Sequence, residues 1–279
     1  MIVTFWGVRG TIPAPGPHTI RYGGNTTSVS VEIGEQVLIL DAGSGIRMLG
    51  NAVMGTGQDL FVLLSHLHTD HILGFPYFHP LYEPNRRIHL LDYLKDDRPW
   101  SLLNLIDGVH FPLFPNELLC DYRRVEGDTL GYLREHGFAV DAVPANHPGG
   151  ALGYRLAHEG RHFVFIPDNE LAASDQTTSF DDFAAFCRNA DILCHDAQFL
   201  DDDMPDKHGW GHSCVRQVCE LAIAAEVKHL VLFHHDPDRS DDALDALQTD
   251  ARVMLAPHGI ACTAAYEGLR MELEGNNAH

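Results

Sequence analysis

Basic residues are scarce in this sequence. Its 279 residues include 19 lysines and arginines against 39 aspartates and glutamates, which gives a formal net charge of −20 at pH 7 with histidine neutral. Proteins hold nucleic acids mainly through lysine and arginine contacts with the phosphates. The charge balance therefore leads us to expect no extended nucleic-acid partner such as tRNA or DNA, although it is compatible with a local basic pocket.

Paired cysteines and long apolar segments are also missing. The six cysteines form no CxxC pair and no regular spacing, which predicts free thiols in a reducing compartment. The first seven residues run directly into a strand, without a basic leader or an apolar stretch long enough to span a membrane. We expect a cytoplasmic protein with no membrane partner. With 45% hydrophobic residues the chain can bury a large core, and we predict one domain over residues 1–279.

Histidine, in contrast, is abundant, with 19 copies, and part of it is concentrated in one short stretch. His66, His68, Asp70 and His71 directly follow the apolar run 60–65, which predicts a buried strand. Side chains alternate between the two faces of a strand, but beyond its end the backbone turns and residues of both parities can converge. Imidazole and carboxylate ligands suit zinc, manganese or iron better than calcium or magnesium. The stretch therefore predicts a metal-binding loop.

This motif resembles that of the metallo-β-lactamase superfamily. The resemblance implies an α/β fold of the α+β kind, a four-layered αββα sandwich, with further ligands at the ends of later strands. His147, Asp168 and His234 each follow an apolar run and match those positions, with His235 as an alternative to His234. Asp41, at the end of an earlier strand, matches a residue that supports the metal loop without binding metal.

The ligand set implied by the resemblance holds two divalent ions, for which zinc is favoured and manganese or iron also fits. It places His66, His68 and His147 on one ion, Asp70, His71 and His234 on the other, and Asp168 between the two.

The C-terminal part, from His212 through the predicted helix 215–225 to His234, resembles ribonuclease Z and its relatives with small substrates. In that family His212 matches a catalytic histidine that binds no metal, and Asp196 stands where the family has a glutamate. The acid here is one methylene shorter, which leaves the geometry of an Asp196–His212 pair open. Ser213 is a candidate N-cap for the helix.

Two ions held close together lower the pKa of a bridging water and clamp the oxygens of an in-line displacement at phosphorus. The leaving alkoxide needs a proton, which His212, oriented by Asp196, would supply. We count Asp70 with these two residues as catalytic. The expected function is a metal-dependent phosphodiesterase acting on a small, cyclic nucleotide-like phosphodiester by hydroxide attack. Ribonuclease Z activity is not favoured, because the chain is acidic and shows no basic Gly/Pro-rich arm.

Two other classes of function use the same motif. A metallo-hydrolase of carboxylic esters, thioesters or lactams would need the metals but would not depend strongly on His212. A redox protein with a di-iron centre fits less well, because His68 stands where such centres typically carry a glutamate and no flavin domain follows.

Substrate contacts are sought in two irregular regions. Arg9 lies between glycines in the loop 7–24, where a guanidinium could bind an anionic substrate. His110 lies in an insertion at about 83–124, part of which predicts a helix that packs on the sandwich. The segment 110–114 is predicted to be either a lid over the metal site or a dimer contact, and a homodimer is one expectation for the assembly.

Overall fold

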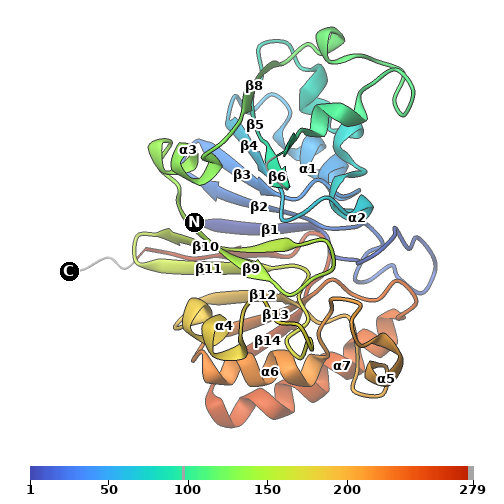
Figure 1. Ribbon diagram of the computed structural model, residues 1–279, viewed down its shortest axis with the longest axis vertical. Helices are drawn as coiled ribbons and strands as arrows, with labels where there is room; N and C mark the ends of the chain where they lie inside the picture. Colours follow the sequence, from blue (N-terminus) through green and yellow to red (C-terminus); the bar gives the residue numbers. More distant parts are fainter. Residues whose placement is uncertain (96–97, 276–279) are drawn as a thin grey trace.

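Two β-sheets packed face to face form the centre of the molecule. The computed structural model describes residues 1–95 and 98–275 (Figure 1). The first sheet has seven strands in the order β15–β1–β2–β3–β4–β5–β8. Their bounds are Arg270–Glu272 (β15), Ile2–Gly7 (β1), Ser28–Ile33 (β2), Gln36–Leu40 (β3), Asp59–Leu63 (β4), Arg87–Leu91 (β5) and Asp121–Val125 (β8).

The second sheet has six strands in the order β14–β13–β12–β11–β10–β9. Their bounds are Ala261–Ala264 (β14), His229–Phe233 (β13), Ile192–Asp196 (β12), Arg161–Ile166 (β11), Ala151–His158 (β10) and Ala139–Ala145 (β9). Strands β11, β12 and β13 pair in parallel, as do β3 and β4 in the first sheet. Parallel neighbours end at the same edge, so the loops that follow them gather there.

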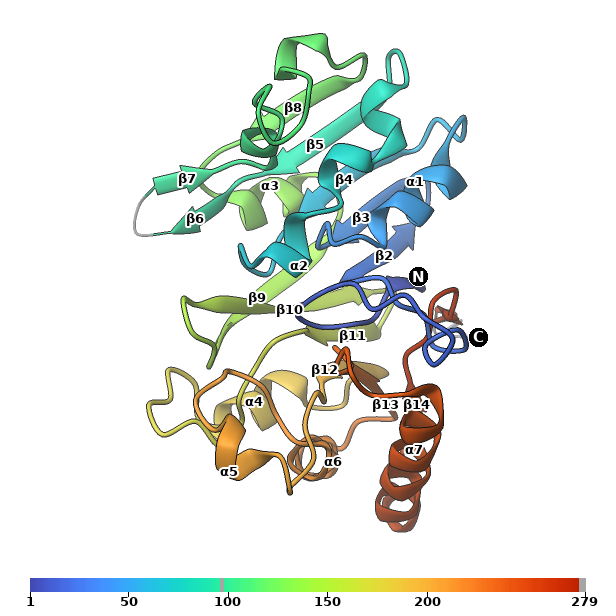
Figure 2. The same cartoon turned by 90° about the vertical axis from the view of Figure 1, so that its right-hand side faces the viewer.

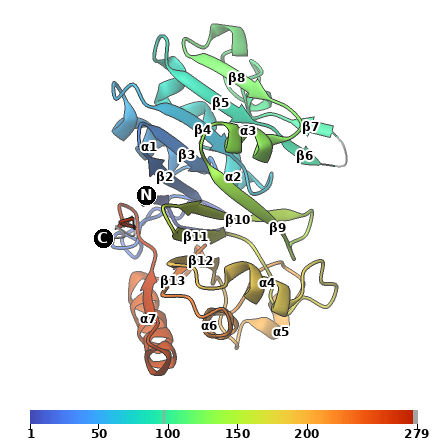
Figure 3. The ribbon, with the colours of Figure 1, turned by 90° about the vertical axis from the view of Figure 1, so that its left-hand side faces the viewer.

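Helices cover the outer face of each sheet, as Figures 2 and 3 show. The helices are Ile46–Val53 (α1), Thr69–Ile72 (α2), Thr129–Glu135 (α3), Phe180–Cys187 (α4), Met204–Lys207 (α5), Val215–Ala224 (α6) and Asp241–Leu255 (α7). Helix α1 lies against the first sheet, whereas α4, α6 and α7 pack on the second. The αββα sandwich that the resemblance implied is confirmed.

The inner core lies between the two sheets. Side chains of both inner faces meet there, among them the fully buried Phe5, Phe61, Phe165 and Phe233. Burying one such ring stabilises the fold by roughly 1.5–3 kcal/mol. The apolar run 60–65, which predicted a strand, supplies part of this core, and β4 agrees with its bounds to within two residues.

The described part of 83–124 differs from the prediction. It forms strands β5 and β8, a hairpin of Tyr93–Lys95 (β6) with Arg98–Trp100 (β7), and two 3-10 turns, Leu102–Leu105 and Pro115–Glu117, instead of an α-helix. The prolines at 112 and 115 restrict helix formation, and the bulky apolar residues there still pack against the first sheet without helical periodicity. The helix prediction was wrong here.

Within the described ranges, no helix is both long and apolar enough to cross a membrane.

Candidate metal centre

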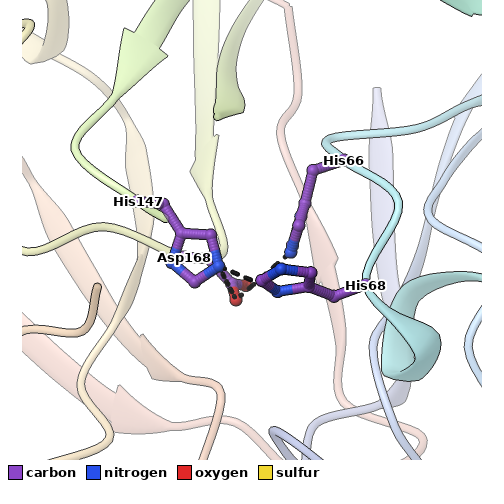
Figure 4. Close-up of side chains that lie close together, drawn as sticks. All are labelled: His66, His68, His147 and Asp168. Carbon is purple, nitrogen blue, oxygen red and sulfur yellow. Dashed lines mark hydrogen bonds and ion pairs between the residues drawn. The ribbon is translucent and has the colours of Figure 1, made fainter. Parts of the chain in front are cut away.

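Four side chains from three loops converge at one edge of the sandwich (Figure 4). His66 and His68 follow β4, His147 follows β9 and Asp168 follows β11; their ligand atoms all lie within 4.8 Å of one another. His147 Nε2 is 3.0 Å from His68 Nδ1 and 3.6 Å from Asp168 Oδ2, which is also 3.7 Å from His66 Nε2. We call these four residues the first group.

A second group lies directly beside the first and consists of Asp70, His71 and His234. His234 Nε2 is 3.1 Å from Asp70 Oδ2 and 3.3 Å from Asp168 Oδ1, and His71 Nε2 is 3.1 Å from the same Asp168 Oδ1. Asp168 therefore turns one carboxylate oxygen to each group, as a bridging ligand would. His235 faces away: its Nε2 lies 2.8 Å from the carbonyl oxygen of Ala265.

Buried polar atoms without hydrogen bonds point into both groups. Among the described residues, His66 Nε2, His71 Nε2 and Asp168 Oδ1 are fully shielded from solvent and form no hydrogen bond. Leaving such an atom unsatisfied costs about 1–3 kcal/mol. Imidazole nitrogens and carboxylate oxygens that converge in this way fit a divalent metal ion as the missing partner.

Burial and opposite charges set the protonation states of the groups. Burial lowers the pKa of the three histidines of the first group, so their imidazoles are neutral at pH 7 and keep a lone pair for a metal. Burial would raise the pKa of Asp70 and Asp168, but the neighbouring His71 and His234 outweigh it and hold both pKa values well below the ordinary range. Both carboxylates are therefore ionised.

Outer hydrogen bonds fix the orientation of the rings. Asp41 accepts hydrogen bonds from the Ser65 amide (2.6 Å) and hydroxyl (2.7 Å), and its Oδ2 lies 2.8 Å from His71 Nδ1. His147 Nδ1 donates to the carbonyl oxygen of Gly211 at 2.9 Å. Each contact directs the opposite ring nitrogen into the site. The supporting role predicted for Asp41 agrees with these contacts.

The end of β13 delivers His234 in a strained conformation. Its φ of 57° is left-handed, which is rare for residues other than glycine and typical of functional sites. Its Nδ1 lies 2.9 Å from Gln198 Oε1, and a Cβ on Gly10 would come within 2.3 Å of the ring. Gly10 therefore leaves room for a ligand histidine. The amide of Thr11 donates to Asp70 Oδ2 at 2.7 Å. Sequence reasoning did not find these three supporting residues.

A histidine–aspartate pair stands at the rim of both groups. His212 Nδ1 lies 2.8 Å from Asp196 Oδ2, and the ring of His212 stacks on that of His234 with centroids 4.9 Å apart. Burial would lower the pKa of His212, but Asp196 outweighs it and raises the pKa to about 9. The shorter acid thus reaches the histidine. The remaining nitrogen is free to face Asp168, since His212, His234 and Asp168 themselves lie within 4.8 Å.

The loop that carries His212 is tied to the end of β11 by residues that the sequence did not reveal. The buried carboxylate of Glu170 accepts hydrogen bonds from the amides of Gly209 (2.9 Å) and Gly211 (2.9 Å). Ser213 does not cap α6, which begins after Cys214. Its hydroxyl donates instead to the carbonyl oxygen of Asn169 at 2.5 Å.

The two residues predicted to contact substrate lie outside the metal groups. Arg9 is completely buried, and its guanidinium donates to the carbonyl oxygens of Gly23, Asp236 and Arg239. It ties the N-terminal loop to the segment after β13, and this geometry contradicts a substrate contact. His110 is exposed, and among the described residues its side chain pairs only with Asp107 (2.7 Å). Its predicted substrate contact stays a prediction.

Comparisons with known proteins agree with this geometry. A family model described as the beta-lactamase superfamily domain matches residues 36–235. Ribonuclease Z of Picrophilus torridus is 25% identical over 290 residues, covering 90% of this chain and 90% of that protein, and further curated relatives carry the same name.

Solved structures give the same picture of the fold. The metallo-beta-lactamase fold protein YhfI from Bacillus subtilis superposes with a TM-score of 0.68 at 20% identity, covering 97% of this chain and 99% of that one. The short form of human tRNase Z superposes with a TM-score of 0.64 at 19% identity, covering 98% and 100%.

These relatives contradict the expectation that nucleic acid is excluded as a partner. The curated relatives are ribonucleases by name, and the human structure is a tRNase. Net charge averages over the whole surface, whereas a phosphodiester is bound and cleaved at one local site. The shortage of lysine and arginine is therefore no ground for excluding RNA.

Proposed function

The chain is a hydrolase that belongs to the beta-lactamase superfamily, and we propose that it cleaves phosphodiesters. The observation that carries this proposal is the His212–Asp196 pair beside two groups of metal ligands that share Asp168. Hydrolysis of a phosphodiester expels an alkoxide, which needs a proton donor at neutral pH. A histidine whose pKa is raised to about 9 supplies one.

The first and second groups would hold two divalent ions, and zinc is the first choice for a set of five histidines and two aspartates. Ions bound there would supply hydroxide at neutral pH and neutralise charge on the phosphoryl oxygens. Among the protein's own residues, Asp168 and Asp70 would hold the ions through their carboxylates and offset part of the positive charge. His71 is held by Asp41, so its ring cannot turn away from the site.

His212 acts as the proton donor in this proposal. Its Nδ1 donates to Asp196, which leaves Nε2–H as the acidic proton. The proton passes from Nε2 to the leaving oxygen as the P–O bond breaks, and the imidazole becomes neutral. Asp196 holds the ring in place, and its other oxygen accepts a hydrogen bond from the amide of Gln198 at 3.0 Å.

Two substrate classes follow, and each has its own support. A small, cyclic nucleotide-like diester is the first candidate. His212 and the two groups of metal ligands lie close together, so a small substrate can reach all of them at once. Cleavage of RNA is the second candidate, because the curated relatives are named ribonuclease Z. Carboxylic esters and lactams also release a group that takes up a proton, so the His212–Asp196 pair supports protonation of a leaving group in general. The relatives named ribonuclease Z favour a phosphodiester among these substrates.

Phosphodiesters with two kinds of leaving group, an alkoxide and p-nitrophenolate, test the proposal. Metal-quantified protein is assayed on 2′,3′-cyclic nucleotides, a precursor tRNA and bis(p-nitrophenyl) phosphate, alongside His212→Ala, Asp168→Ala and, as a matched control, the exposed His258→Ala. We expect His212→Ala to keep its metals and to lose roughly 10²–10⁴-fold in rate when the leaving group is an alkoxide. The loss on bis(p-nitrophenyl) phosphate should be much smaller, because p-nitrophenolate leaves without a proton.

Asp168→Ala should lose both metal and activity on every diester, whereas His258→Ala should match the wild type. Equal losses for both leaving groups in His212→Ala would remove the proton-donor role. Turnover of lactams or thioesters, with no diester cleaved, would overturn the phosphodiesterase proposal.

A further inference from the structure

An exposed tryptophan stands beside the candidate centre. Trp210 lies two residues before His212 and is 57% exposed. A ring this large is normally buried, because its exposed apolar surface costs free energy. Exposed aromatic residues close to a site of chemistry are often contacts for a ligand.

The backbone around this ring is held firmly. Gly209 and Gly211 flank Trp210 with φ of 84° and 88°, a left-handed conformation that favours glycine. The carboxylate of Glu170 accepts a hydrogen bond from the amide of each glycine. The carbonyl oxygen of Gly211 accepts a hydrogen bond from His147. The exposed ring is therefore presented by a loop that is fixed to the metal ligands.

A lysine accompanies the ring. Lys207 is one of three lysines in the sequence, and its Nζ lies 3.9 Å from the centroid of the Trp210 ring. The same Nζ is 5.7 Å from the ring of Phe199, which packs edge-on against His212 with centroids 5.7 Å apart. Within the described ranges Lys207 forms no ion pair, although the chain is strongly acidic, so its positive charge is available to an anion.

Together these contacts describe a ring and a cation next to the proton donor. A Trp210 that served only to pack on the protein surface would have both faces of its ring covered. The lysine occupies one face, and the ring's large exposure leaves surface for a second partner. An aromatic ring with a nearby cation is the combination by which proteins bind single nucleotides, one stacking on the base and the other pairing with a phosphate.

We propose that Trp210 and Lys207 form a nucleotide-binding patch, with Trp210 stacking on a nucleobase and Lys207 contacting a phosphate of the substrate. This inference rests on the proposed function and narrows it: the substrate is a phosphodiester that carries a nucleobase beside the scissile phosphate. The inference therefore excludes cyclic phosphates of sugars that carry no base as substrates. Both a cyclic nucleotide and an RNA end meet the requirement.

Two diesters with the same leaving group isolate the stacking. Thymidine 5′-(p-nitrophenyl phosphate) and methyl p-nitrophenyl phosphate differ in the presence of a nucleoside, and neither needs the proton of His212. We measure kcat and KM of the zinc-loaded wild type, Trp210→Ala, Trp210→Phe and Lys207→Met. Tyr266→Ala, which removes an exposed aromatic ring on the connection from β14 to β15, is the matched control.

Trp210→Ala should lower the preference for the thymidine diester about 5- to 150-fold, the range reported by alanine substitution for one stacked base. The change should appear in KM, and Trp210→Phe should retain most of the preference. Lys207→Met should raise KM for both diesters alike, and Tyr266→Ala should change neither. An unchanged preference in Trp210→Ala would overturn the inference while leaving the phosphodiesterase proposal intact.

Binding of AMP to the zinc-loaded protein, followed by tryptophan fluorescence, provides a readout that needs no turnover. We expect quenching in the wild type that is lost in Trp210→Phe. Should neither diester be cleaved, the proposed function fails, and this titration alone decides the patch. Quenching that depends on Trp210 supports it, and no quenching, or the same quenching in Trp210→Phe, overturns it.

Discussion

Removing the acid of the Asp196–His212 pair should move the basic limb of the pH–rate profile. In the wild type, Asp196 raises the pKa of His212 to about 9 against the lowering effect of burial. In Asp196→Asn only burial and weaker charges remain, so we expect the pKa to fall to the ordinary histidine value of about 6.5 or below. A proton donor works below its pKa, and the rate should therefore fall above pH ~9 in the wild type and above ~6.5 in the variant.

The size of the effect follows from the protonated fraction. At pH 8 a group with a pKa of about 9 is about 90% protonated, whereas one at about 6.5 is about 3% protonated, so kcat/KM should drop roughly 30-fold. At pH 6 most of both populations carries the proton, and the loss should be within a few-fold. The assay is kcat/KM from pH 5.5 to 10 on a 2′,3′-cyclic nucleotide, with bound metal quantified at each pH.

The same profile on bis(p-nitrophenyl) phosphate is the control, because that leaving group needs no proton. The basic limb of the profile on this substrate should lie at the same pH in the wild type and in Asp196→Asn. If Asp196→Asn keeps a limb near pH 9 on the cyclic nucleotide, Asp196 does not set the protonation of His212. If both substrates shift together with a loss of metal, the effect belongs to the metal centre and the assigned role of the pair is refuted.

Three further predictions concern other parts of the structure. Glu170→Ala leaves two backbone amides without their acceptor; we expect about 2–4 kcal/mol less stability in urea unfolding and a lower kcat, and full retention of both would contradict its role in holding the loop. Gly10→Ala places a methyl group against the ring of His234; metal analysis should find about one ion fewer per chain, whereas an unchanged metal content would show that the loop can yield. Burial, followed by the charge of His136, lowers the pKa of His89 to about 4, so the unfolded chain binds a proton between pH 6.5 and 4 that the folded one does not. The free energy of unfolding should therefore decrease as the pH is lowered from 6.5 to 4, and its dependence on pH should be weaker in His89→Phe. The same dependence in His89→Phe would show that other groups cause the acid sensitivity.

The parts of the site that the sequence predicts are those delivered directly by a strand end. His66, Asp168 and His234 come directly after apolar runs or within two residues of them, and a buried run fixes where its end emerges. The motif and the family resemblance then predict that these strand ends meet at one metal site. Arg9 was misread because two of its three carbonyl partners, Asp236 and Arg239, lie 227 and 230 residues away and carry no side-chain signature.

The irregular insertion was predicted less well for a related reason. Its apolar residues bury themselves in 3-10 turns and a short hairpin, so neither helical nor strand periodicity appears. The net charge of the whole chain led to the wrong prediction that nucleic acid is excluded as a partner, because it says nothing about the few residues that surround one phosphate. Local composition near the site, such as Lys207 among the aspartates at 201–206, is more informative than the total.

The three residues after β11 show why a site can depend on positions that no pattern marks. Asp168 turns its carboxylate to both metal groups, and the amide of Asn169 donates to Asp196 at 3.1 Å. Glu170 then holds the loop of His212. Three consecutive residues, two through their carboxylates and one through its backbone amide, thus contact the metal groups, Asp196 and the loop of His212. Lengthening this turn by one residue should separate the proton donor from the metals, giving a protein that binds both ions but cleaves only diesters with p-nitrophenolate-like leaving groups. Metal analysis and the two-leaving-group assay on such an insertion measure this directly, and retained cleavage of cyclic nucleotides would show that the two parts are positioned independently.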